Sequence, residues 1–195
     1  ALKETNALAT ASAARYEALD KQLTYAKKVL GWWKGVVYRQ NNWDKLQTAI
    51  TTADSQVNDE ALSDEALASA LSALTMATKA VDKGVYESGS AVGKGDALNN
   101  PDNTWCNERS MQSKHWILFW EAGYGKTAPS SVESILNTAD KIFEFYADSL
   151  KYLTINQGKS KTDTYKMIIR LRHTDEWEAS GSGIDNIIGL LTLSR

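Results

Sequence analysis

Tryptophan side chains close to charged residues are the features of this sequence that could bind a ligand. Trp105 precedes Glu108 by three residues and Arg109 by four, so an indole, a carboxylate and a guanidinium lie close together in the chain. An indole face packs on sugar rings and apolar groups, while the two charged groups hydrogen-bond to polar ones. This segment could therefore form a sugar or peptide contact, and the structural interpretation, which we favour, is a strand-edge salt bridge packed on Trp105.

The adjacent residues Trp32 and Trp33 could provide a second contact surface. We expect one of the two rings to complete a hydrophobic core. The other, if it is exposed, would contact a ligand, because exposed large aromatic side chains often mark binding surfaces. The residues that we predict for binding are Trp32, Trp33, Trp105, Glu108 and Arg109.

Residues suited to catalysis or metal binding form no recognisable motif in this sequence. The two histidines, His115 and His173, have no second ligand at the spacing of a zinc site. The single cysteine, Cys106, fits a buried thiol better than a reactive one. Glu121, at the end of a predicted strand, could point into a cleft or lie in a solvated loop. We therefore expect no catalytic residue, no metal ligand and no cofactor in this chain, and the sequence leaves open whether the protein is an enzyme.

The composition is that of a folded protein with balanced charge. Hydrophobic residues make up 43% and charged residues 24% of the 195 residues, which suits one sizeable domain or two small ones. The 22 basic residues are balanced by 24 acidic ones, so we expect no nucleic acid partner. The longest apolar stretch, 184–193, is far shorter than the roughly 20 residues that span a bilayer, so we expect no membrane span.

Residues 1–83 predict an antiparallel bundle of three helices, because apolar residues recur at spacings of three and four. The first helix is expected to end at Gly31, since glycine suits the left-handed conformation at a helix terminus. Asn41 and Asn42 offer caps to the second helix, and the third is expected to begin at Ser63. The apolar stripes are Tyr16, Leu19, Leu23, Ala26 and Leu30, then Trp43, Leu46, Ile50, Ala53 and Val57, then Leu67, Leu71, Leu74, Ala77 and Val81.

The pattern changes after the bundle. Residues 84–103 are rich in glycine, serine and asparagine, which is typical of a linker or long loop. Residues 104–195 predict an α/β domain with a right-handed βαβ unit, so the whole chain is expected to have a mixed α+β fold. The expected elements are strands near 115–120, 166–172 and 187–193, and a helix near 131–152.

Two further expectations concern the last part of the chain. The final predicted strand has no closing helix after it, so we expect the α/β domain to be incomplete at its C-terminus. Trp177 lies between two glutamates and precedes a glycine-rich stretch that we read as a turn. We expect this turn to bring the ring over the sheet, so that Trp177→Ala costs about 3 to 5 kcal/mol.

The helical part resembles a known type of module. Residues 38–50, Tyr-Arg-Gln-Asn-Asn-Trp-Asp-Lys-Leu-Gln-Thr-Ala-Ile, lead into the second predicted helix. With this entry, the segment 16–83 is similar to the FIVAR-type three-helix modules of exported bacterial surface proteins and carbohydrate-active enzymes. The resemblance implies a helical spacer or adhesion module.

The second part resembles an uncharacterised family of exported bacterial proteins. The likeness lies in residues 105–125, in 159–163 and in 176–183, the last reading Glu-Trp-Glu-Ala-Ser-Gly-Ser-Gly. Longer members of that family continue into a helix with an HExxH-like zinc motif, which this chain lacks. The resemblance implies that residues 104–195 form the upstream sheet of a zincin-like peptidase domain, with zinc bound only in a longer form.

These resemblances make one function the leading hypothesis. It is an extracytoplasmic bacterial protein, secreted or anchored at the cell surface, that joins a helical spacer or adhesion module to a zinc-peptidase-like domain portion without its metal motif. The alternative is a non-enzymatic cell-surface module that binds a glycan or host protein through Trp32, Trp33 or the Trp105 region. A purely structural spacer is a third hypothesis. The expected partners are glycans or extracellular proteins, and the sequence does not determine the oligomeric state.

Overall fold

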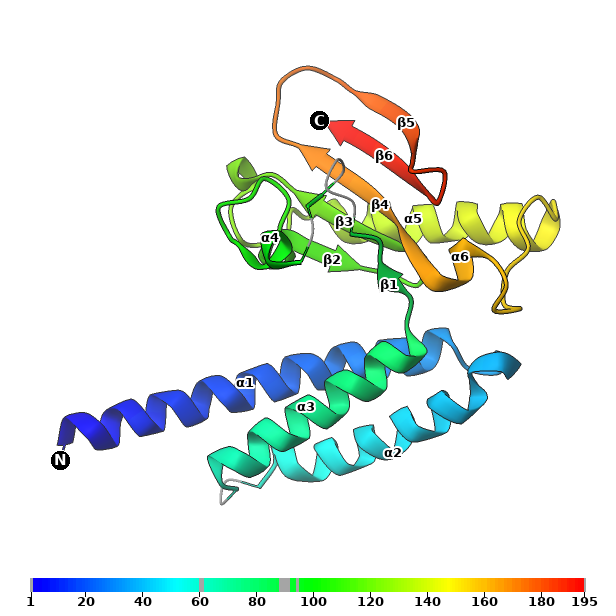
Figure 1. Ribbon diagram of the computed structural model, residues 1–195. Coiled ribbons are helices and arrows are strands. Elements are labelled where there is room, and N and C mark those ends of the chain that lie inside the picture. The colour runs from blue at the N-terminus through cyan, green and yellow to red at the C-terminus, as the bar shows by residue number, and fades with distance from the viewer. Residues whose placement is uncertain (1, 60–61, 88–91, 94, 195) are drawn as a thin grey trace. The chain divides into compact units, whose positions relative to one another are not determined.

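The computed structural model describes residues 2–59, 62–87, 92–93 and 95–194, with side chains from residue 13 onward. The chain divides into two compact units, residues 1–82 and residues 83–195, and each is considered by itself. The first unit is helical and the second contains a mixed sheet, which confirms the predicted α+β fold (Figure 1). Within the described residues, no helix combines the length and the apolar character needed to cross a bilayer.

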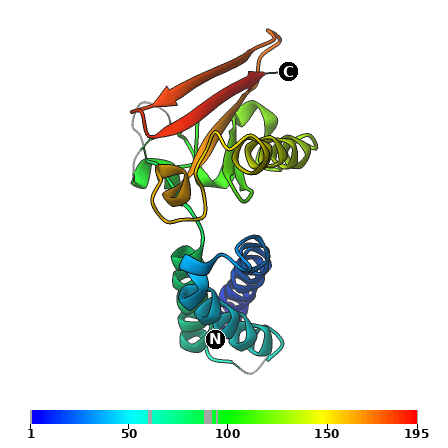
Figure 2. The same cartoon turned by 90° about the vertical axis from the view of Figure 1, so that its right-hand side faces the viewer.

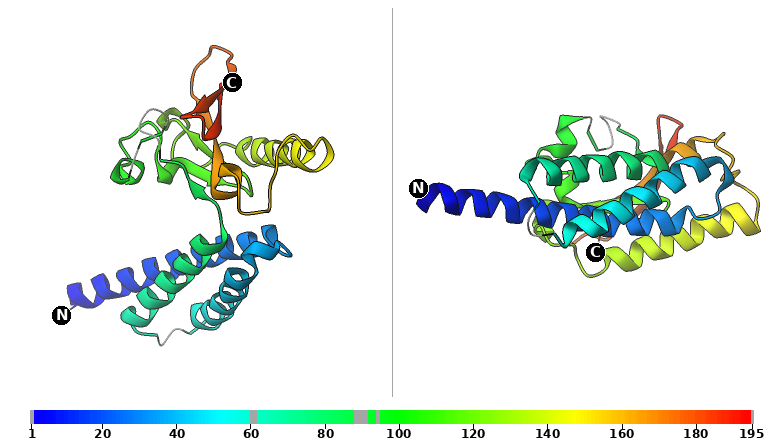
Figure 3. Two further views of the ribbon diagram at one scale, coloured as in Figure 1. Left: turned by 45° about the vertical axis from the view of Figure 1, so that its right-hand side comes forward. Right: turned by 90° about the horizontal axis from the view of Figure 1, so that it is seen from below.

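In the described part of the first unit, three α-helices pack against one another (Figure 3). They are α1 (Leu2–Trp32), α2 (Gln40–Val57) and α3 (Asp64–Val81). A short 3-10 helix (Val37–Arg39) precedes α2, so α2 begins without the asparagine caps that the sequence suggested. Ser63 caps α3 as predicted, because its side chain accepts a hydrogen bond from the Ala66 amide. The first helix continues through Gly31 instead of ending there.

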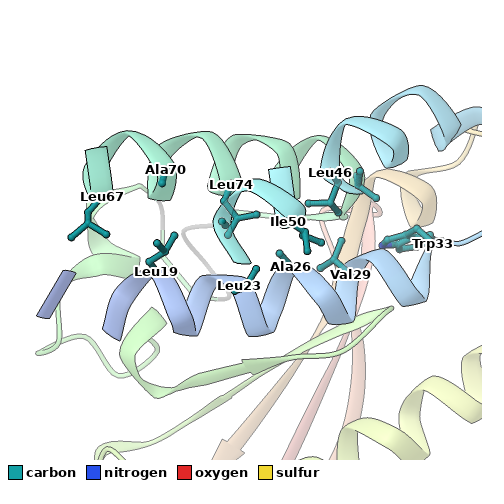
Figure 4. Close-up of a cluster of buried hydrophobic side chains, with 12 residues drawn as sticks. Leu19, Leu23, Ala26, Val29, Trp33, Leu46, Ile50, Leu67, Ala70 and Leu74 are labelled. Atoms are coloured by element: carbon teal, nitrogen blue, oxygen red, sulfur yellow. The ribbon is translucent and has the colours of Figure 1, made fainter. Parts of the chain in front are cut away.

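The predicted apolar stripes build the core of the bundle (Figure 4). Leu19, Leu23 and Ala26 of α1 face side chains such as Ile50 of α2 and Leu74 of α3. All five are buried, so a common apolar interior holds the three helices together.

The second unit is built on a sheet with strand order β2-β3-β4-β6-β5, and β1 also pairs with β4. Strands β3, β4 and β6 are parallel to one another, while β2 and β5 are antiparallel to their neighbours. The strand bounds are β1 (Gly84–Val85), β2 (Ser110–Gln112), β3 (Trp116–Trp120), β4 (Tyr165–Arg172), β5 (Ala179–Ile184) and β6 (Ile188–Ser194).

Helix α5 (Val132–Glu144) forms the crossover between β3 and β4, as the βαβ pattern predicted, and is seen end-on in Figure 2. A π-helical turn (Phe145–Ser149) follows it, so the regular α-helix is shorter than expected. The remaining short helices are α4 (Asp96–Asn99), α6 (Lys161–Thr164) and two 3-10 turns, Asn107–Arg109 and Ala122–Tyr124.

Side chains alternate between two hydrophobic cores, one on each face of the sheet, because successive strand residues point in opposite directions. On one face Ile117, Phe119 and Ile168 pack with Leu98 of α4. On the other face a second set packs with α5. Its buried members are Trp116, Leu118, Trp120, Val132, Leu136, Ala139, Ile169 and Leu171. Strand β3 is therefore buried on both sides, which explains why its sequence is a continuous apolar run.

The segment 84–103, expected to be a linker or long loop, lies in the second unit. Its described residues include β1, α4 and two buried side chains, Val92 and Leu98, that join the core of one sheet face. The glycine-rich stretch after Trp177, expected to be a turn, is strand β5.

Candidate functional site

The two tryptophans predicted for binding in the bundle have different surroundings. Trp33 is fully buried, the Arg39 guanidinium lies 4.3 Å from its ring centroid, and its Nε1 donates to Asp82 at 3.2 Å. It is the ring that completes the core. Trp32 is partly buried and packs edge-on against Tyr25, with ring centroids 5.9 Å apart. Only Trp32 has surface that a ligand could touch.

Trp105, Glu108 and Arg109 do not converge on one point. Arg109 is buried, and its guanidinium donates to the main-chain oxygens of Pro101 (2.8 Å), Asn103 and Thr104. Arg109 therefore fastens the loop before it and offers a ligand little surface.

The other two members of this group face different partners. The exposed Glu108 pairs with Lys126 at 2.7 Å, while the guanidinium carbon of Arg170 lies 5.7 Å from the centroid of the partly buried Trp105 ring. Glu108 thus forms a salt bridge with Lys126 and not the expected one packed on Trp105.

A buried polar cluster lies at the amino ends of β3 and β4. Three of its side chains are buried from solvent, namely Lys83, His115 and Lys166. The Nζ of Lys83 lies 2.8 Å from Nδ1 of His115, and the Nζ of Lys166 donates to the main-chain oxygen of Ser113 at 2.6 Å. The His115 ring stacks on Phe143 of α5 with centroids 4.2 Å apart. These contacts tie β1, β3, β4 and α5 together.

Asp140 of α5 completes this cluster. Its carboxylate accepts hydrogen bonds from the Ser113 hydroxyl (3.0 Å) and from the amides of Lys114 (3.1 Å) and His115 (3.0 Å). Burial raises the pKa of Asp140, and the three hydrogen bonds oppose this effect. Functional sites of parallel sheets lie at the carboxyl ends of the strands, so we interpret this cluster at the opposite end as structural.

The carboxyl ends of β3 and β4 hold a second group of polar residues. The Glu121 carboxylate accepts a hydrogen bond from the His173 amide at 2.8 Å, and the Tyr124 hydroxyl donates to the Arg172 carbonyl at 3.1 Å. The ring of the exposed His173 packs edge-on against Tyr124. It also lies close to Gly123, since a Cβ atom added to Gly123 would be 2.5 Å from the imidazole. Glu121 and Tyr124 thus fix the point where the chain leaves β4.

From this point the loop 173–178 leads to β5 and carries the most exposed aromatic group of the second unit. The Trp177 side chain is 77% exposed. Asp175 and Glu176 are also exposed, and neither forms an ion pair with any described residue. Glu178 pairs with Arg172 at 2.7 Å, and this hydrogen bond holds the pKa of Glu178 below its usual value.

The exposure of Trp177 contradicts the expectation that its ring is at least partly buried. The residues after it form β5 and not a turn that folds back. Ser194 binds both neighbours of Trp177, since its hydroxyl donates to the Glu176 carbonyl and its amide to the Glu178 carbonyl. The main chain on both sides is thereby fixed to β6 while the ring points into solvent.

We now expect Trp177→Ala to change the free energy of unfolding by no more than about 0.5 kcal/mol, because exposed side chains contribute little to the core. Urea denaturation of the whole chain, followed by circular dichroism, measures this change. A loss of about 3 kcal/mol or more would show that the ring is buried in solution.

Strand β5 has one free edge. It pairs with β6 on one side, and no described residue pairs with its other side (Figure 1). The Ser194 amide donates to the Glu178 carbonyl, so the even-numbered residues of β5 direct their main-chain groups towards β6. The amides and carbonyls of Ala179, Gly181 and Gly183 therefore point outwards. Five of the six β5 residues are exposed, and only alanine, serine and glycine side chains flank this edge before Ile184.

The residues that could hold a metal do not gather in the described part of the chain. No group of three or more histidine, cysteine, aspartate or glutamate side chains there is arranged to bind an ion. Cys106 is buried, as expected, and the two histidines belong to the separate clusters described above.

Comparison with known proteins places most of the chain in one family. Residues 77–195 match the model of a family described as a family of unknown function, DUF6055. This match includes the whole second unit and begins within α3. No curated protein and no solved structure matches the chain.

Proposed function

The chain belongs to the family of unknown function DUF6055, and from this premise we propose that its second unit binds an extended peptide along the free edge of β5. In this proposal the protein is extracytoplasmic and bacterial, and the sheet is the upstream portion of a zinc-peptidase-like domain. The bundle serves as a spacer or adhesion module. The binding role of β5 is the part that the geometry supports directly.

The outward main-chain groups of Ala179, Gly181 and Gly183 are the observation that carries this proposal. An extended peptide can add to an exposed sheet edge, where main-chain hydrogen bonds supply the affinity. Proteins usually protect such edges with charges, prolines, bulges or covering elements, because an open edge pairs with other chains. Within β5 no residue is charged and none is proline. An edge left open in this way is suited to receive a strand.

The order of the sheet supports the peptidase-like part of the proposal. The parallel strands β3, β4 and β6, the crossover helix and the antiparallel outer strands fit the role that the zincin resemblance implies. In that role the sheet supports a metal-binding helix and offers an edge strand to an extended substrate. The described residues do not themselves fit a zinc site, since His115 faces Lys83 and the ring of His173 packs on Tyr124. We therefore assign binding, and no catalytic step, to this chain.

Replacing Gly181 tests the proposal. Gly181→Pro removes an outward N–H group. We expect this variant to bind a peptide about tenfold more weakly, because one hydrogen bond is lost and the proline ring clashes with the incoming strand. Proline is tolerated at edge positions whose amide faces solvent, so the fold should survive. The probe is a fluorescent ten-residue peptide of alternating valine, threonine and serine without charge, and the readout is fluorescence anisotropy.

Gly181→Ala is the matched control, because alanine keeps the amide. Its Cβ would lie 3.5 Å from Cδ2 of Leu191, an ordinary van der Waals distance. We expect this variant to bind within about threefold of the original chain, below the worth of one hydrogen bond. Equal binding by the proline and alanine variants, or no binding by the original chain, would contradict the proposal.

The alternative function is a non-enzymatic surface module that binds a glycan, and the exposed ring of Trp177 is the observation that favours it. An indole face can stack on a sugar ring in the same way as on an apolar side chain. Binding of neutral oligosaccharides that is lost in Trp177→Ala and unchanged in Gly181→Pro would support this alternative over the peptide-binding edge.

A further inference from the structure

We infer that the loop 173–178 gives the β5 edge a preference for peptides with a lysine or arginine near the end that lies beside Trp177. This inference rests on the proposed function, because it specifies which peptides the free edge accepts. It follows from the position of Trp177, from the charges beside it and from the small side chains of β5.

Trp177 stands at the start of the free edge. It precedes the first residue of β5 by two positions, a distance of about 7 Å along an extended chain. A side chain near the end of a peptide paired with β5 can therefore reach the indole. The ring is 77% exposed and forms no hydrogen bond or ring contact with the described residues, so its face is open to such a side chain. The first β5 residues, Ala179, Ser180 and Gly181, are too small to shield it.

The charge around Trp177 is negative. Asp175 and Glu176 carry exposed carboxylates that form no ion pair with a described cation, and Glu176 lies close enough to Arg172 to feel its charge. Arg172 pairs with Glu178 and also attracts Glu121 and Glu176, while Arg170 attracts Glu178. The carboxylates of Glu121, Asp175, Glu176 and Glu178 still outnumber these two cations. Electrostatic complementarity therefore favours a cationic partner at this end of the edge.

A lysine or arginine side chain suits this combination of groups. The face of an indole attracts an ammonium or guanidinium group, and a neighbouring carboxylate adds a charge-assisted hydrogen bond. Hydroxyl groups of a sugar could also donate hydrogen bonds to the carboxylates, but a neutral sugar is not attracted by their net negative charge. The outward amides of Ala179 and Gly181 likewise point to a peptide main chain.

Two peptides and one pair of variants test the inference. The first peptide is the neutral ten-residue probe described above, and the second has two lysines in place of the residues at one end. We expect the lysine peptide to bind about tenfold more tightly, the sum of two exposed ion pairs and one cation–π contact. Raising the sodium chloride concentration from about 0.05 to 0.5 M should remove most of this difference, because salt screens exposed charges.

The double variant Asp175→Asn/Glu176→Gln should reduce the preference for the lysine peptide from about tenfold to about threefold, the part that the Trp177 ring still supplies, while still binding the neutral peptide. The matched control is Glu133→Gln/Asp148→Asn, which also removes one glutamate and one aspartate from exposed positions of the second unit. It should keep the preference. Trp177→Ala should reduce the preference about threefold, in line with one exposed cation–π contact.

The outcomes separate this inference from the proposed function. Equal affinity of the original chain for both peptides, with both bound about tenfold more weakly by Gly181→Pro, would overturn the charge preference and leave the binding edge intact. An equal loss of preference in the two double variants would also overturn it, because the effect would then come from net charge alone. Absence of binding by either peptide would contradict the proposed function itself.

Discussion

Replacing Trp33 with alanine should lower the free energy of unfolding of the helical unit by about 3 to 5 kcal/mol, the usual cost of removing a large aromatic side chain from a core. The ring is fully buried among side chains of the bundle. Its Nε1 donates to Asp82, and the Arg39 guanidinium stacks on its face. Arg39 in turn donates to the Val81 carbonyl at the end of α3, so the ring supports the junction of all three helices.

A loss of this size approaches the whole stability of many small domains, which is 5 to 15 kcal/mol in general. Urea denaturation followed by far-ultraviolet circular dichroism should show the helical transition move to much lower denaturant concentration. Trp177→Ala is the matched control, since it makes the same chemical change at an exposed position. A cost below about 1 kcal/mol for Trp33→Ala would mean that the bundle closes without this ring.

Replacing Asp140 with alanine should destabilise the second unit by about 2 to 4 kcal/mol. The change leaves the Ser113 hydroxyl and the amides of Lys114 and His115 without their acceptor, and buried donors without acceptors are costly. Asp140→Asn should be less destabilising than Asp140→Ala but still less stable than the original chain. The asparagine oxygen can accept from Ser113 and His115, but its NH2 group would then face the Lys114 amide, which is also a donor. Glu133→Ala, an exposed change on the same helix, is the control and should cost less than about 0.5 kcal/mol.

The pH dependence of this loss gives a second test. Burial raises the pKa of Asp140 above its ordinary value of 3.8, so the folded protein retains the proton to a higher pH than the unfolded chain does. The resulting stabilisation is complete below 3.8 and is lost as the pH rises through the folded pKa. The stability difference between the original chain and Asp140→Asn should therefore shrink from about pH 3.5 to pH 7. A difference that grows over this range would mean that the folded state lowers this pKa.

The buried cluster around His115 shows where sequence reasoning reached its limit. The sequence predicts no metal-binding role for His115, because no second ligand lies at the spacing of a zinc site. No local pattern indicates that Lys83 and Lys166, distant in the chain, join the same buried cluster. One weak signal is present. Lys166 lies near the start of an apolar strand, and Ile168, two residues later and therefore on the same face of the strand, packs in the core. Such a lysine is buried only if a carbonyl is available, and here Ser113 supplies it.

The free edge of β5 was also beyond the sequence. Its residues, Ala-Ser-Gly-Ser-Gly-Ile, have neither the alternating pattern nor the β-branched residues that predict a strand. They form one because β6 offers a complete row of hydrogen-bonding groups beside them. The exposure of Trp177 follows from the same pairing, since Ser194 fixes the main chain on both sides of it.

The sequence by itself determined the three helices of the bundle, the crossover from β3 through α5 to β4, and the final strand β6. These elements carry their information locally, because regular spacing of apolar residues fixes which face of each element is buried. Tertiary structure alone decided which tryptophans are buried, where the polar groups of the second unit meet, and which strand edge stays open. Those features depend on contacts between residues far apart in the chain, and no local pattern of residue types encodes them.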